Sequence, residues 1–130
     1  MIYQENTAVS AAAIGDLRES VGWNRMEQCY RDMRMTSFYH IAVYDEEFLV
    51  GYIDCVSNGV TDGYIQDLMV HPNYQNNGIG TELMHRMIAY LKSKSIYMIS
   101  VVYDDSLLSF YKRFGFTEML CGQLQTYECE

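Results

Sequence analysis

The sequence predicts an α/β fold, a sandwich in which a mixed central β-sheet carries helices on both faces. Residues 64–70 form an apolar strand-like run, residues 79–91 repeat apolar side chains at helical spacing, and residues 96–102 form a second continuous apolar run. Strand, helix and buried strand in that order predict two parallel neighbours joined by a right-handed crossover. The 130 residues, 49% of them hydrophobic, suit one domain with one core, residues 1–130.

Before this crossover, the chain is expected to form a short strand, two helices and a β-hairpin. Thr7 has a side chain that caps helices, and the apolar residues after it recur at helical spacing. Two runs rich in β-branched and aromatic residues flank an acidic turn at residues 45–47, as in a hairpin. The expected elements are a strand over 2–5, helices over 8–20 and 24–35, strands over 38–44 and 48–56, and a strand that begins near residue 60 or 64.

After the crossover, a short helix is expected over residues 105–114, ended by Gly115. Residues 116–118 and 123–129 are expected to form a last pair of strands. The single proline, Pro72, lies where the strand before the glycine loop must end.

The loop between the strand and the helix of the crossover carries the most informative motif. It reads Gln75-Asn76-Asn77-Gly78-Ile79-Gly80-Thr81. The first N–H groups of a helix have no partner within it and lie at the positive end of the helix dipole, and glycines let a ligand approach the backbone closely. The loop therefore predicts a seat for phosphate oxygens. It lacks the Lys-Ser/Thr of a P-loop and the third glycine of a dinucleotide loop.

The segment Gln75-x-x-Gly78-x-Gly80 resembles the coenzyme A loop of the GNAT acyltransferase superfamily. A later segment, Ser106 to Phe116, resembles the same family's short helix, which carries a tyrosine, here Tyr111, and closes on Gly-Phe. The two motifs stand in the family's order and cover residues 64–117. The resemblance implies a GNAT-like domain whose two central parallel strands splay apart.

The resemblance further implies an N-acetyltransferase that transfers an acetyl group from acetyl-CoA to a primary amine, by direct attack in a ternary complex. Backbone groups of the first splayed strand would pair with the pantetheine arm, and a β-bulge is expected near residues 67–69. Asp105 stands where the family usually has an asparagine that bonds this arm. The implied cofactor-binding residues are Met69, Val70, Gln75, Asn76, Asn77, Gly78, Ile79, Gly80, Thr81, Asp105 and Tyr111.

Three residues are candidates for the chemistry. Tyr111 matches the family tyrosine that protonates the leaving thiolate, and the N–H of Val70 would stabilise the developing oxyanion. Asp67 is the candidate base, acting directly or through a water, although it is equally consistent with a structural hydrogen-bond acceptor at the bulge. Since Gln66 and Asp67 alternate along the strand, only one of them is expected to face the cleft.

The acceptor site is expected within residues 17–38 and the neighbouring strand ends. Aromatic and acidic side chains there would suit a cationic amine, but they are equally consistent with core aromatics and a solvated helix face. These residues are Trp23, Tyr30, Tyr39, Glu19, Glu27 and Asp32.

Composition excludes several classes of function. A net charge of −8 argues against nucleic acid as the partner, and an acidic surface favours an amine substrate, although it is equally consistent with a surface that has no role in recognition. No apolar run reaches membrane-spanning length and no signal peptide is visible, so a cytoplasmic protein without a membrane partner is expected. Four cysteines without metal-ligand spacing are expected to be reduced, mostly buried thiols, with no metal site; a terminal hairpin could place Cys121 opposite Cys129, but nothing in the sequence shows that they pair.

Two alternatives to an enzyme stay open on sequence alone. One is a catalytically silent acyl-CoA-binding sensor or regulatory module of the same fold. The other is a phosphate-ligand binder unrelated to coenzyme A, which would leave Tyr111 and Gly115-Phe116 unexplained. The acceptor, the acyl chain length and the number of subunits, a homodimer included, are not determined by the sequence.

Overall fold

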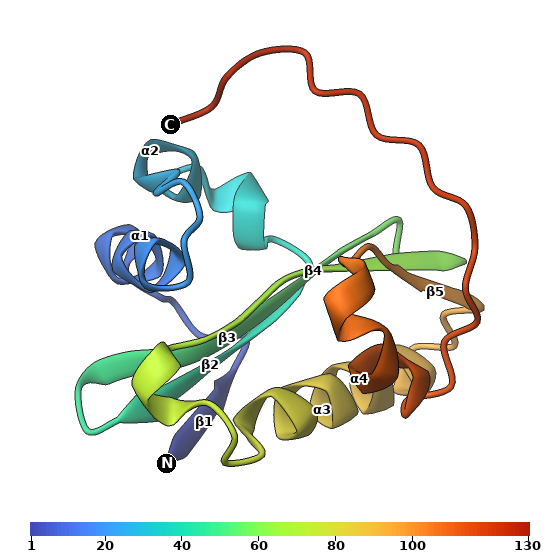
Figure 1. Cartoon of the computed structure of the whole chain (residues 1–130), viewed down its shortest axis with the longest axis horizontal. Coiled ribbons are helices and arrows are strands. Elements are labelled where there is room, and N and C mark those ends of the chain that lie inside the picture. Colours follow the sequence, from blue (N-terminus) through green and yellow to red (C-terminus); the bar gives the residue numbers. More distant parts are fainter.

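A computed structural model describes all 130 residues (Figure 1). Five strands form one sheet in the order β1-β2-β3-β4-β5. The strands are β1 (Ile2–Glu5), β2 (Tyr39–Asp45), β3 (Phe48–Ser57), β4 (Asp62–Val70) and β5 (Met98–Val101). The helices are α1 (Ala11–Ser20), α2 (Glu27–Tyr30), α3 (Ile79–Ser93) and α4 (Leu108–Lys112), with 3-10 turns η1 (Met33–Thr36), η2 (Pro72–Tyr74) and η3 (Asp105–Leu107).

The sheet is mixed, as the sequence predicts. Strands β1 to β4 pair antiparallel in succession, whereas β4 and β5 pair parallel across the crossover through α3. The parallel pairing runs from Asp62 opposite Met98 to Ile65 opposite Val101 and then stops, although β4 continues to Val70. The two strands therefore part beyond Ile65, which is the splay that the sequence resemblance implies.

Helices cover both faces of the sheet, so the predicted α/β sandwich is confirmed (Figure 1). On one face, α3 buries the apolar stripe of Ile79, Leu83, Met87 and Leu91 against the sheet, together with Tyr111 of α4. On the other face, α1 and α2 form a smaller core. Its buried residues are Ile14, Leu17, Tyr30, Ala42, Leu49, Tyr52 and Met69.

The early helices differ from the prediction in their ends. Ser10 rather than Thr7 caps α1, because its Oγ accepts a hydrogen bond from the N–H of Ala13 (3.2 Å). The expected helix over 24–35 is instead the single turn α2 followed by η1. Asp32 divides them, since its carboxylate accepts from the N–H of Arg34 (3.0 Å) and so starts a new turn.

The predicted final pair of strands is wrong. No strand follows β5; residues 117–130 run as an extended tail that returns to α2 (Figure 1). There the carbonyl of Glu130 accepts from the N–H of Met26 (2.9 Å), and that of Cys129 accepts from Nδ2 of Asn24 (2.6 Å). The tail's large apolar side chains are mostly exposed, so they offer no face that a sheet would bury. These are Met119, Leu120, Leu124 and Tyr127.

No helix in the chain is both long enough and apolar enough to span a membrane.

Candidate active site

The loop that begins α3 presents a run of unused backbone N–H groups. From Gln75 to Thr81, no main-chain amide donates a hydrogen bond within the chain, and no side chain caps the helix. Gly78 adopts a left-handed conformation (φ +82°), and a Cβ placed there would meet no atom within 4 Å. The loop is therefore open on the side where its amides and the positive end of the helix dipole would meet an anion.

Side chains hold this loop in shape from within. Nε2 of Gln75 donates to the carbonyl of Val70 (2.9 Å), which ties the loop to the end of β4. Nδ2 of Asn77 lies 3.3 Å from the carbonyls of Tyr74 and Gln75. These bonds use side-chain donors and main-chain carbonyls, so they leave the amides free.

The bulge expected near residues 67–69 is present in β4. Tyr52 pairs with Met69 and Asp54 with Gln66, so that one residue of β3 stands opposite two of β4, Asp67 and Leu68. Asp67 has a left-handed backbone (φ +58°). Its conformation interrupts the regular alternation of side chains along the strand.

The main chain of Val70 points toward the splay. Val70 stands opposite Gly51, and the N–H of the next residue, His71, donates to the carbonyl of Val50 (2.8 Å). This pattern marks Val70 and Gly51 as a non-hydrogen-bonded antiparallel pair, whose main-chain groups face away from each other. By the same alternation, Met69 turns its main-chain groups toward β3, and its side chain is buried in the core beneath α1.

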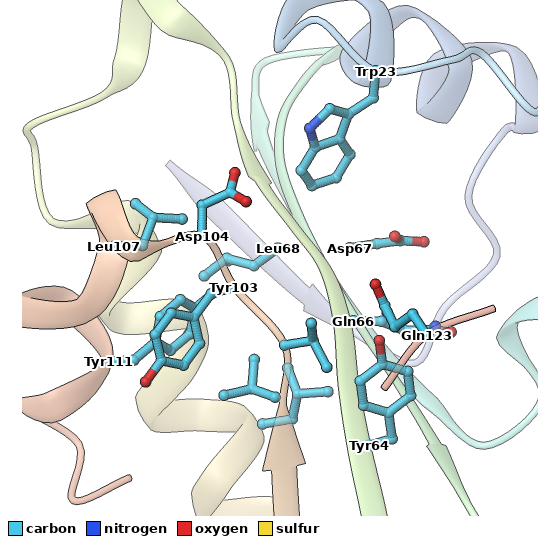
Figure 2. Close-up of a pocket in the computed structure, with 13 residues that line it drawn as sticks. Trp23, Tyr64, Gln66, Asp67, Leu68, Tyr103, Asp104, Leu107, Tyr111 and Gln123 are labelled. Carbon is cyan, nitrogen blue, oxygen red and sulfur yellow. The ribbon is translucent and has the colours of Figure 1, made fainter. Parts of the chain in front are cut away.

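A cavity of about 330 Å³ opens between the splayed strands. In Figure 2, Leu68, Tyr103, Asp104, Leu107 and Tyr111 lie to one side of β4, and Trp23, Tyr64, Gln66, Asp67 and Gln123 to the other. Ile65, Val101 and Val102 complete the lining of the cavity. The residues of the glycine loop lie past the end of β4 and do not border this cavity.

Tyr111 reaches the cavity from α4 although it is only 5% exposed. Its ring stacks on that of Tyr103, with centroids 4.4 Å apart, and meets Phe110 and Phe116 edge to face. Burial, and next the neighbouring Tyr103, raise the pKa of the Tyr111 hydroxyl to about 12. The phenol is therefore protonated at neutral pH and able to donate.

Asp67 also borders the cavity, but both its oxygens are already engaged. Oδ1 lies 3.3 Å from Nη1 of Arg18, and Oδ2 accepts a hydrogen bond from the hydroxyl of Tyr30. Burial, followed by the Asp67 charge, raises the pKa of Tyr30 well above its usual range, so that phenol stays a donor. Gln66 borders the cavity as well, so the expectation that only one of the pair faces it is wrong, because the bulge breaks the alternation.

The remaining predicted acceptor residues are mostly used elsewhere, and Trp23 alone among them borders the cavity. Tyr39 lies on the opposite face of the sheet and stacks on Tyr90 of α3, with centroids 3.5 Å apart. The three acidic side chains form ion pairs outside the cavity: Glu19 and Glu27 with Arg25, and Asp32 with Arg34.

Sequence reasoning missed several residues at the cavity. Asp104 borders it, whereas the predicted Asp105 begins η3 and does not. Leu68 borders the cavity and Met69 does not. The predicted bulge could have indicated this exchange, because a bulge changes which side chains face the cavity. Gln123 comes from the tail that the sequence placed in a strand, and no local signal marks it.

Beneath the acceptor side of β4 lies a buried carboxyl, Asp54, which is 1% exposed. Its Oδ2 accepts from the hydroxyl of Tyr52 (3.0 Å) and its Oδ1 from the N–H of Cys55 (2.7 Å). Burial raises the pKa of Asp54 to about 7, an effect that these two hydrogen bonds oppose and the nearby Asp67 reinforces.

Similarity to known proteins identifies the family of this chain. The family model described as acetyltransferase (GNAT) family matches residues 8–116. The chain belongs to this family. An uncharacterized N-acetyltransferase, ycf52-like, of Prochlorococcus marinus is 29% identical over 121 residues, which is 89% of this chain and 67% of that protein. The chain spans about two thirds of the length of this protein and of its ycf52 relative in Gracilaria tenuistipitata.

Solved GNAT structures share the fold. A GNAT family acetyltransferase of Streptococcus pneumoniae superposes with a TM-score of 0.75 at 25% identity, over 99% of this chain and 98% of the other. An aminoglycoside 6'-N-acetyltransferase, solved with coenzyme A, superposes with a TM-score of 0.71 at 19% identity, over 88% and 84%. The GNAT architecture deduced from the two sequence motifs is thus confirmed.

Proposed function

We propose that this GNAT protein is an N-acetyltransferase that transfers an acetyl group from acetyl-CoA to a primary amine by direct attack in a ternary complex. The observation that carries the proposal is the run of unpaired amides from Gln75 to Thr81, open beside a splayed strand whose cavity contains Tyr111. The structural relative solved with coenzyme A supports the choice of cofactor. The net charge of −8 favours an amine that arrives as a cation.

The cofactor site follows the loop and the strand. Amides of Gln75, Asn77, Gly78, Gly80 and Thr81 would hold the pyrophosphate, with Asn76 and Ile79 shaping the loop. The pantetheine arm would lie along Val70, whose main chain faces the splay, and reach Asp104 at the start of the short helix. The geometry thus favours Val70 over Met69 and Asp104 over Asp105 for these contacts.

In this reaction, protein groups would stabilise the oxyanion, protonate the leaving thiolate and position the amine. The N–H of Val70 would stabilise the charge that develops on the thioester oxygen as the amine nitrogen bonds to the carbonyl carbon. When the carbon–sulfur bond breaks, the hydroxyl of Tyr111 would give its proton to the thiolate. Asp67 already pairs with Arg18 and accepts a hydrogen bond from Tyr30. Its carboxylate would accept the proton of the amine, either directly or through a water that it holds beside the amine.

The direct test is thiol release from acetyl-CoA with a panel of primary amines: polyamines, arylalkylamines, aminoglycosides and lysine peptides. We expect release with at least one amine class, together with the matching acetylated product by mass spectrometry. Acetyl-CoA that binds in calorimetry but releases no thiol with any amine would instead support the sensor. Absence of acetyl-CoA binding would overturn the proposal and the assignment of the loop.

A further inference from the structure

One buried cation, Arg18 of α1, connects the elements around the acceptor side of the cavity. It is 6% exposed and does not itself border the cavity. A buried guanidinium must have its donors satisfied, because leaving them unpaired away from water is costly. The partners of Arg18 therefore show which parts of the structure it holds in place.

Arg18 uses its donors on two separate elements. Nη1 pairs with Oδ1 of Asp67 at the bulge of β4 (3.3 Å). Nε donates to the carbonyl of Asn24 (2.5 Å) and Nη2 to its Oδ1 (2.8 Å), both in the α1–α2 loop. The planar guanidinium thus fixes the distance between that loop and the bulge, which a single ammonium cannot do.

Two further contacts extend this arrangement. The Cζ atom of Arg18 lies 5.3 Å from the ring centroid of Trp23, the indole that borders the cavity. Asn24, held by Arg18, donates through Nδ2 to the carbonyl of Cys129 and so ties down the end of the tail that brings Gln123 to the cavity. Arg18 therefore connects the α1–α2 loop and the bulge of β4 directly, and the end of the tail through Asn24.

We infer that Arg18 is a positioning residue for the acceptor amine: it fixes Asp67, Trp23 and the tail as one wall, and it does not act on the cofactor. This inference rests on the proposed function. None of its contacts involves residues 75–81, Val70 or Tyr111. Loss of Arg18 should accordingly weaken the use of the amine while leaving the use of acetyl-CoA intact.

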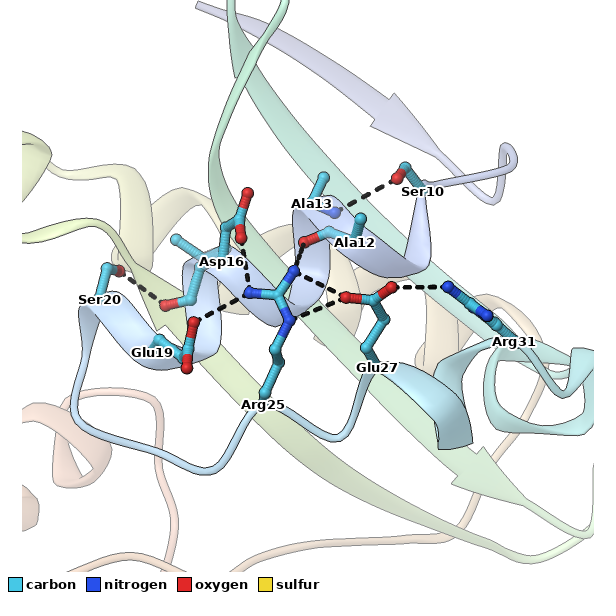
Figure 3. Close-up of polar contacts among 10 residues, drawn as sticks. Ser10, Ala12, Ala13, Asp16, Glu19, Ser20, Arg25, Glu27 and Arg31 are labelled. Atoms are coloured by element: carbon cyan, nitrogen blue, oxygen red, sulfur yellow. Dashed lines mark hydrogen bonds and ion pairs between the residues drawn. The ribbon is translucent and has the colours of Figure 1, made fainter. Parts of the chain in front are cut away.

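Arg25 provides a matched control in the same region. It also ties α1 to α2, through Asp16, Glu19, Glu27 and the carbonyl of Ala12 (Figure 3). None of these residues borders the cavity, and the Arg25 side chain is 32% exposed. Arg18→Gln and Arg25→Gln therefore each remove one positive charge, the first from α1 and the second from the α1–α2 loop, but only the first removes contacts to residues that border the cavity.

The experiment is steady-state kinetics of the full chain with acetyl-CoA and the best amine of the panel. For Arg18→Gln we expect KM for the amine to rise roughly tenfold or more, the equivalent of losing one or two charged hydrogen bonds, with KM for acetyl-CoA within about twofold. Arg18→Lys, which keeps the charge but not the fork, should rescue part of this loss. Arg25→Gln should change neither KM beyond about twofold.

A second readout does not depend on turnover. Trp23 is the only tryptophan, so its fluorescence reports the wall directly. We expect a shifted emission maximum in Arg18→Gln and not in Arg25→Gln. If Arg18→Gln fails to fold, Asn24→Ala serves in its place, since Asn24 is exposed and removing its side chain leaves no unpaired buried charge. It should raise the amine KM about threefold, the loss expected for one hydrogen bond.

The outcomes separate the two claims. An unchanged amine KM in folded Arg18→Gln, or equal rises in both KM values, would overturn the positioning role and leave the N-acetyltransferase standing. A wild-type protein that acetylates no amine would overturn the proposed function, and the role of Arg18 with it.

Discussion

The glycine loop at the start of α3 and the acceptor wall, which consists of Arg18 with Asp67, Trp23 and the end of the tail, differ in how they use their polar groups. In the loop, backbone amides are left without partners, and side chains such as Gln75 merely hold the loop open. In the wall, nearly every polar group is engaged: Asp67 with Arg18 and Tyr30, and Arg18 with Asn24. An unfilled set of donors suits an invariant anion such as a pyrophosphate, whereas a saturated network fixes the shape that selects a substrate.

The sharpest test of this comparison lies between the two regions, at Tyr111. Tyr111→Phe removes the proton donor but keeps the ring that stacks on Tyr103. We expect kcat to fall about 100- to 10,000-fold, the usual contribution of general acid catalysis, with KM for acetyl-CoA unchanged. Stopped-flow or steady-state thiol release measures this. Tyr97→Phe, at an exposed tyrosine that does not border the cavity, is the control.

An equal loss of affinity and turnover in folded Tyr111→Phe would remove Tyr111 from the acid role. It would leave packing of the cofactor arm as its function.

The second test changes the glycine loop before α3, which is proposed to bind the pyrophosphate. Gly78→Val places a branched side chain in the open space beside Gly78, and we expect acetyl-CoA affinity to fall about 100-fold, comparable to the loss of two charge-assisted hydrogen bonds. Calorimetry measures it. Gly59→Val is the matched control, because Gly59 also has a positive φ (+77°) but lies in the β3–β4 turn. Equal binding by the two variants would locate the phosphate seat elsewhere.

The loop could be predicted from sequence because its determinants are contiguous. Two glycines, a proline that ends the strand and an apolar stripe at helical spacing are all read within residues 70–91. The same holds for the splayed strands, whose apolar runs flank that helix. Prediction succeeded where local sequence and tertiary position coincide.

The acceptor wall could not be predicted in the same way. The pairing of Arg18 with Asp67 joins α1 to the bulge of β4, and no sequence pattern near either residue predicts this ion pair. The left-handed Asp67 defeated the alternation rule, and Gln123 reached the cavity through a tail predicted to be a strand. Each error concerns a residue whose place is set by distant contacts.

The third test concerns the buried carboxyl beneath the wall. The folded pKa of Asp54, about 7, exceeds the unfolded value near 3.9, so the native state binds the extra proton. Stability from this group is therefore fully present below about pH 4 and is lost as the pH rises from about 4 to 7. Asp54→Asn should remove this slope, so that it gains about 2 to 3 kcal/mol of stability relative to the wild type when the pH is raised from 5 to 8.

Urea unfolding at pH 5 and pH 8 measures the effect. Asp62→Asn, at an exposed position at the start of β4, should keep the wild-type slope. Identical slopes in Asp54→Asn and the wild type would show that Asp54 is ionised throughout this range.

The smallest effect on amine KM is expected from a disulfide that would link the end of the tail to α2. Sγ of Cys29 and Sγ of Cys129 lie 3.9 Å apart, and both residues are partly exposed. A thiol oxidant such as diamide should therefore join them, taking two electrons and two protons, because the sulfurs need only approach to about 2.0 Å. The terminal hairpin across which Cys121 and Cys129 could have faced each other is absent; in the extended tail, Cys121 is exposed, and its thiol donates only to the carbonyl of Gly122.

Non-reducing mass spectrometry with peptide mapping should show a Cys29–Cys129 link in the wild type and in Cys121→Ser, and none in Cys129→Ser. Since Asn24 and Met26 already hold the end of the tail, the link restrains a segment that is in place, and we expect the amine KM to change by no more than about twofold. A larger change would mean that the tail moves during turnover. In that case Gln123 would be a gate, and the saturated network around Arg18 would be only the closed state of the wall.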